Sequence, residues 1–129
     1  MTRYFGPYLL TFAVALLPLP AAADAASEIV NAAQHAEYAA QATSIDVAHA
    51  HLHHALNCLV GPNGMDFDAT ALNPCKGAGN GAIPDTSDAA KQKSLEAAAN
   101  KAREGLKAND LSTAQKDAAE TEKMLKAIK

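Results

Sequence analysis

Alanine constrains the fold of this chain more than any other residue type. It makes up about a quarter of the residues from Asp24 onward, and most other residues in the range 27–59 are compatible with a helix. The sequence therefore predicts an all-α protein that begins with one long helix over residues 27–59.

The rest of the chain divides into a loop and two shorter helices. Residues 60–86 are rich in Gly, Pro and Asn, which predicts a long loop. A second helix is expected over residues 87–107, with Thr86 or Ser87 as its cap. The pair Asn109-Asp110 predicts a turn in which Asp110 caps a third helix over residues 111–128.

The apolar residues of each expected helix lie on one side, which predicts helix-on-helix packing. These faces are Tyr38, Ala42, Ile45, Leu52, Leu56 and Leu59; then Leu95, Ala99, Ala102 and Leu106; and finally Leu111, Ala114, Ala118, Thr121, Leu125 and Ile128. We expect residues 24–129 to form a single domain, a small antiparallel bundle of three helices. A kink in the first helix would make the bundle four-helix-like. Because alanine-lined helices bury little apolar area, an additional covalent link is useful.

The first 23 residues have the pattern of a secretory signal. A short basic start that includes Arg3 precedes an apolar run, residues 4–17, that is too short to span a bilayer comfortably. Pro18 and Pro20 follow, and the small residues 21–23 predict cleavage before Asp24. We therefore expect a periplasmic or secreted protein with no membrane span or lipid anchor after cleavage.

The two cysteines, Cys58 and Cys75, are interpreted in the light of export. In an oxidising compartment they are expected to form a disulfide, which would stabilise the loop by about 3 kcal/mol in the chain-entropy model. The alternative makes Cys58, one helical turn from His54, a thiolate metal ligand. That alternative needs a reduced thiol.

Charge is unevenly distributed along the chain. Residues 24–75 contain six acidic residues and no Lys or Arg, whereas residues 76–129 contain ten Lys or Arg and eight Asp or Glu. The first part should attract cations, and no basic patch indicates nucleic-acid binding.

All five histidines lie in that acidic part, and four of them fall in the run His49-Ala50-His51-Leu52-His53-His54. Clustered imidazoles favour transition-metal binding. On one helix, Asp46, His49 and His53 share a face and form a predicted three-ligand stripe, with His35 further along nearly the same face. His51 and His54 point to a different side, where they would form a second two-ligand site or lie at the surface.

The expected ligand is a divalent transition metal, Cu before Ni or Zn, because nitrogen and oxygen ligands follow that order of affinity. Zinc motifs with paired cysteines and the His-Glu-x-x-His motif are missing, so buffering or carriage is favoured over catalysis. Two chains in a homodimer would also be able to complete a four-ligand site.

The chain resembles the small histidine-rich periplasmic metal-binding proteins that fold as alanine-rich helical bundles. The resemblance lies in Gln34-His35-Ala36-Glu37 with Ala39-Ala40, in residues 49–56, and in Gly105-Leu106-Lys107-Ala108-Asn109-Asp110 leading to Ala114 and Ala118. It implies metal binding at His35, His49, His51, His53 and His54. The chain departs from that family because its last two predicted helices contain no histidine and its loop contains a disulfide.

Other activities have less support in the sequence. The haem-attachment, phosphate-loop and nucleophile-elbow motifs are missing, so we do not expect an enzyme. The alternative to metal binding is an exported interaction module that docks on a periplasmic protein partner. In that case residues 61–84 would form the recognition loop, and the histidines would be incidental or at the interface.

Overall fold

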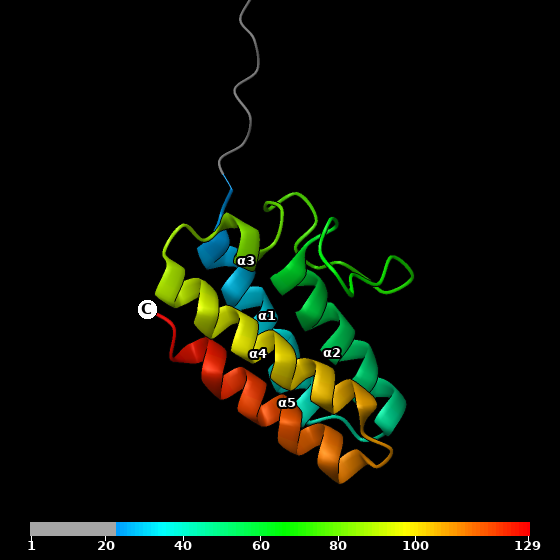
Figure 1. The fold of residues 1–129 in the computed structure, drawn as a ribbon. Coiled ribbons are helices and arrows are strands. Elements are labelled where there is room, and N and C mark those ends of the chain that lie inside the picture. The colour runs from blue at the N-terminus through cyan, green and yellow to red at the C-terminus, as the bar shows by residue number, and fades with distance from the viewer. Residues whose placement is uncertain (1–22) are drawn as a thin grey trace, which may run out of the picture.

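The structure of this protein is a computed structural model that describes residues 23–129. These residues form five helices and no strand, so the all-α class is confirmed for them: α1 (Ala25–Ala40), α2 (Ile45–Val60), α3 (Ala82–Asp85), α4 (Ala89–Lys107) and α5 (Leu111–Lys126) (Figure 1). Apart from Ala23, the predicted signal segment lies outside the described residues.

The single helix predicted for residues 27–59 is wrong, because a short turn divides that segment into α1 and α2. The backbone N–H of Gln41 bonds back to the last turn of α1. The side-chain oxygen of Ser44 then accepts a hydrogen bond from the N–H of Val47 at 3.3 Å and caps α2. Hydroxyl residues such as Thr43 and Ser44 favour caps and turns over helix interiors, which accounts for the break.

The turn folds α2 back along α1, and the four long helices share one core. α1 packs against α2 and α5, while α4 packs against α5 and α2 (Figure 1). One layer of this core takes a fully buried residue from each long helix: Ala39, Leu52, Ala102 and Ala118. Three of these four side chains are single methyl groups, so the helices approach closely around Leu52.

The predicted apolar face of the first segment is buried in part. Leu52, Leu56, Leu59 and Ala42 are buried as expected. Tyr38 is not, since 42% of it remains exposed. The heptad spacing that linked Tyr38 to α2 assumed one continuous helix, and the turn removes that phase relation.

The caps of the last two helices are both aspartates. Asp88, not Thr86 or Ser87, caps α4 by accepting from the N–H of Lys91 at 2.8 Å. The hydroxyl of Thr86 instead donates to the carbonyl of the first residue of α3 at 2.7 Å. Asp110 caps α5 as predicted.

Two neighbouring residues of α2 hold the long loop that follows it. The predicted disulfide between Cys58 and Cys75 is confirmed, with their Cα atoms 5.2 Å apart. The buried side chain of Asn57 donates to the carbonyls of Asp68 and Leu72 at 3.0 and 3.2 Å, and it accepts from the N–H of Asp68 at 2.9 Å. The loop therefore has a defined path across the end of α2.

Glu28 of α1 contacts the far end of the same loop. It is 1% exposed, and its Oε1 accepts from the N–H of Gly81 at 2.9 Å, while its Oε2 is buried with no hydrogen-bond partner. Burial raises the pKa of Glu28 to about 7, and the negative charge of Asp85 adds to that effect. Glu28, whose carboxyl binds a proton more tightly than an ordinary glutamate, thus holds this end of the loop through Gly81.

We expect Asn57→Ala to lower the free energy of unfolding by about 2–3 kcal/mol, because three loop backbone groups lose their partner. Urea denaturation measures this change. Asn63→Ala is the control, since Asn63 is exposed in the same loop, and we expect it to change stability by less than about 0.5 kcal/mol. Equal effects of the two substitutions would contradict the structural role of Asn57.

Glu28 should make stability depend on pH in a defined direction. Its pKa in the folded protein lies above the ordinary value of 4.5, so its contribution to stability is complete below about pH 4.5 and is lost as the pH rises through 7. Glu28→Gln cannot ionise. The unfolding free energy of this variant relative to the unmodified protein should therefore rise between pH 4.5 and 8, by on the order of 3 kcal/mol. Denaturation curves across this pH range measure the difference, and a difference that does not vary with pH would refute the prediction.

Candidate metal site

The turn between α1 and α2 brings His35 and His51 together. His35 lies eight residues before Thr43 and His51 lies eight residues after it, so an antiparallel return of the chain places them opposite each other. Their Nδ1 atoms are 3.2 Å apart. In the metal-free protein one of these two nitrogens donates a hydrogen bond and the other accepts it.

His54 completes a three-histidine cluster (His35, His51 and His54). It follows His51 by one helical turn on α2, and its ring centroid is 5.0 Å from that of His35 and 5.4 Å from that of His51. One nitrogen from each histidine can be chosen so that all three lie within 4.8 Å of one another. Within residues 23–129, this is the only group of three or more His, Cys, Asp or Glu residues with ligand atoms so close.

The nitrogen separations suit one metal ion. Metal–nitrogen bonds of about 2.0–2.1 Å at tetrahedral angles put two ligand nitrogens roughly 3.3 Å apart. The His35–His51 separation of 3.2 Å is already close to that value. One nitrogen from each of the three histidines lies within 4.8 Å of the others, so the remaining adjustment is on the order of 1.5 Å. The three-histidine cluster is therefore close enough to bind a metal ion.

The cluster also favours the protonation state that metals need. Burial, followed by the neighbouring His54 and His51, lowers the pKa of His35 to about 4. Burial, followed by His51 and His53, lowers the pKa of His54 as well. Both imidazoles are thus neutral at pH 7, and a neutral imidazole has a lone pair available for coordination.

Tyr38 lies beside the cluster, although its sequence position did not suggest this. Its ring centroid is 5.6 Å from that of His35, one turn earlier on α1, and 5.4 Å from that of His51. Its hydroxyl accepts a hydrogen bond from the side chain of Gln34 at 2.8 Å. The spacing of three residues between His35 and Tyr38 was the available signal, but it could be interpreted only once the turn was known.

The other predicted ligands lie elsewhere. Asp46, His49 and His53 are not brought together as a group in the described part of the chain, and His35 joins His51 and His54 rather than this stripe. The prediction put His35 on the same helix face as Asp46, His49 and His53 because it treated α1 and α2 as one continuous helix. Cys58 is unavailable as a thiolate ligand because its sulfur is in the disulfide.

His53 has a different neighbour, supplied by the loop. Its Nδ1 lies 3.5 Å from Oδ2 of Asp68, the residue whose backbone is held by Asn57. Hydrogen bonds from Thr70 lower the pKa of Asp68, so it is ionised at neutral pH. The Nε2 atom of His49 is buried with no hydrogen-bond partner in the structure. These two histidines therefore do not add to the three-histidine cluster.

Comparison with known proteins identifies no family and no function for this chain. A scan against protein-family models gave no match, and neither the curated proteins nor the solved structures gave a significant one. Among the helices of residues 23–129, none is both long and apolar enough to cross a membrane.

Proposed function

We propose that this protein binds a divalent transition metal through His35, His51 and His54 and acts as an exported metal buffer or carrier. The observation that carries the proposal is the convergence of three imidazole nitrogens from two helices within 4.8 Å. Burial and the neighbouring imidazoles lower the pKa of His35 and of His54, which keeps their lone pairs available to a metal ion.

The number of ligands favours exchange over permanent retention. A closed structural zinc site has four protein ligands, whereas three imidazoles leave at least one coordination position for water or for a ligand from a receiving molecule. The three histidines are only partly buried, so an ion bound there stays accessible. These features suit delivery and release, and the proposal assigns no catalysis to the site.

Copper is the proposed first choice among the metals. With imidazole ligands, affinity rises through Ni(II) to Cu(II) and falls again at Zn(II). The absence of Lys and Arg from residues 24–75 keeps the surroundings of the cluster attractive to cations. The disulfide fits an oxidising compartment, which agrees with the proposed export through residues 1–23 to the periplasm or outside the cell.

In a homodimer, a second copy of the chain would supply a fourth ligand. The exposed Tyr38 beside the cluster leaves this part of α1 free of intramolecular cover. Metal-dependent dimerisation would then accompany binding, and it is measured by size-exclusion chromatography with and without the metal.

Calorimetric titration with Cu(II), Ni(II) and Zn(II) tests the proposal with two matched double variants. We expect a dissociation constant of about 1 μM or tighter for Cu(II), weakened at least about 100-fold in His35→Ala/His51→Ala. His49→Ala/His53→Ala removes the same number of imidazoles outside the cluster and should bind nearly as well as the unmodified protein. Far-UV circular dichroism checks that both variants keep their helices.

Two other outcomes of the titration would contradict the proposed site or the proposed function. Loss of binding in the His49/His53 variant with retention in the His35/His51 variant would move the site to the Asp46 stripe. Binding no tighter than about 1 mM, or equal binding by all three proteins, would refute the metal proposal and favour the interaction module.

Tyr38 provides an independent measurement of where the ion binds. The chain has no Trp, and beyond residue 22 Tyr38 is its only Tyr. Because paramagnetic Cu(II) quenches a nearby aromatic ring, tyrosine fluorescence should fall with stoichiometric Cu(II). Tyr38→Phe should bind the ion without that change. Quenching that persists in the His35/His51 variant would place the ion outside the cluster.

A further inference from the structure

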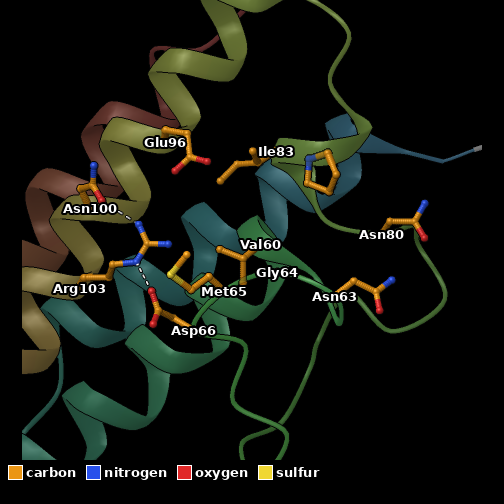
Figure 2. Close-up of a pocket in the computed structure, with 11 residues that line it drawn as sticks. Val60, Asn63, Gly64, Met65, Asp66, Asn80, Ile83, Glu96, Asn100 and Arg103 are labelled. Carbon is orange, nitrogen blue, oxygen red and sulfur yellow. Dashed lines mark hydrogen bonds and ion pairs between the residues drawn. The ribbon is translucent and has the colours of Figure 1, made fainter.

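A pocket of about 580 Å³ lies where the loop after α2, the short helix α3 and one side of α4 meet (Figure 2). Its volume falls within the usual range for small-molecule sites. None of its lining residues is a histidine, so it is separate from the three-histidine cluster. The metal proposal leaves this pocket without a role.

The walls of the pocket are fixed by close backbone contacts. A Cβ added at Gly61 would lie 1.6 Å from the carbonyl oxygen of Asn80, so the two ends of the loop meet there with no room for a side chain. Glu28 holds Gly81, the residue after Asn80, by accepting a 2.9 Å hydrogen bond from its N–H. These contacts fix the backbone on the loop side of the pocket.

One part of the lining is apolar and partly uncovered. Val60, Met65, Ile83 and Pro84 contribute carbon surface to the pocket. Met65 is 82% exposed. An apolar group that entered the pocket would remove this surface from water.

The charges of the pocket sum to minus one. Arg103 is already engaged, because its Nε donates to Asp66 at 2.8 Å and its Nη1 donates to Asn100 at 2.7 Å (Figure 2). Glu96 lies on the same helix, two turns before Arg103, and it has no ion-pair or hydrogen-bond partner among residues 23–129. With Asp66 and Arg103 paired, Glu96 is the charge that remains for a ligand.

From this arrangement we propose that the pocket binds a small organic cation, a protonated amine with an apolar body. The ammonium group pairs with the carboxylate of Glu96. The apolar body lies against Met65, Val60 and Ile83. The side-chain amide of Asn63 is available to a polar substituent on the ligand, whereas that of Asn80 already donates to Asp85 at 3.1 Å. An anionic ligand is disfavoured, because two carboxylates, Asp66 and Glu96, line the pocket against the single guanidinium of Arg103.

Three probes of nearly equal size and different charge test the proposal: 2-phenylethylamine, 2-phenylethanol and 3-phenylpropionate. Two-dimensional NMR titration of the isotope-labelled protein, kept metal-free with a chelator, follows the backbone signals of the lining residues. We expect saturable shifts there with the amine, weaker binding of the alcohol, and no saturation with the carboxylate. Equal binding of the three, or no saturable shift with the amine in the millimolar range, would overturn the proposal.

Variants at exposed positions separate charge from shape. Glu96→Gln should weaken amine binding roughly tenfold and leave the alcohol unaffected. Glu104→Gln is the matched control, because it removes the same charge from the same helix outside the pocket, and it should bind the amine normally. Met65→Ala should weaken the amine and the alcohol alike. An unchanged affinity of Glu96→Gln for the amine would refute the assignment of Glu96.

Discussion

The return of the chain between α1 and α2 is the constraint on which the rest of the structure depends. It converts a 36-residue alanine-rich segment into two helices of 16 residues each that pack against each other, α1 (Ala25–Ala40) and α2 (Ile45–Val60). A single helix of that length would leave much of its apolar surface without a partner. The same reversal decides which histidines meet, because only antiparallel helices can place His35 opposite His51 at 3.2 Å.

Because its core consists largely of small side chains, this fold needs stabilising links besides apolar packing. Among residues 23–129, most of the buried apolar residues are alanines, 13 of 22, which let helices approach closely but contribute little apolar area each. The protein adds specific links at the end of the molecule where the long loop runs. The disulfide at Cys58, the amide of Asn57 and the carboxyl of Glu28 hold that loop at three points. Of these links, Glu28 bonds to Gly81 beside the pocket residue Asn80, and Asn57 holds the backbone of Asp68, whose carboxylate lies beside His53.

Much of the fold could be predicted from the sequence, because alanine content, Gly/Pro-rich segments and capping residues act locally. The class, the disulfide, most of the loop and the Asp110 cap follow from such local signals, whereas the short helix α3 (Ala82–Asp85) lies inside the loop predicted for residues 60–86. The turn at Ser44 could not be predicted as readily. It contains no Gly or Pro, and its capping signal competes with the strong helix preference on either side. Asp88 was missed for a related reason, since Thr86, Ser87 and Asp88 are all acceptable caps and tertiary packing selects among them.

The grouping of the histidines in the candidate site could not be predicted from local sequence patterns. All three of its histidines were identified as possible ligands, but their grouping depended on a contact between residues 16 positions apart. Periodicity on one helix can say only which residues share a face, so it joined His35 to the wrong partners.

The division of charge along the chain has a structural consequence that links the two proposed sites. The acidic first part and the later helices meet through ion pairs such as Glu37–Lys126 and Asp66–Arg103. Exposed pairs of this kind stabilise a fold only weakly. Through these two pairs, Glu37 neutralises Lys126 and Asp66 neutralises Arg103. Among residues 23–129 Glu96 forms no ion pair, and the segment that supplies the three-histidine cluster contains no Lys or Arg. Both proposed ligands are accordingly cations, of different kinds: a compact metal ion at the imidazoles and an organic ammonium in the pocket.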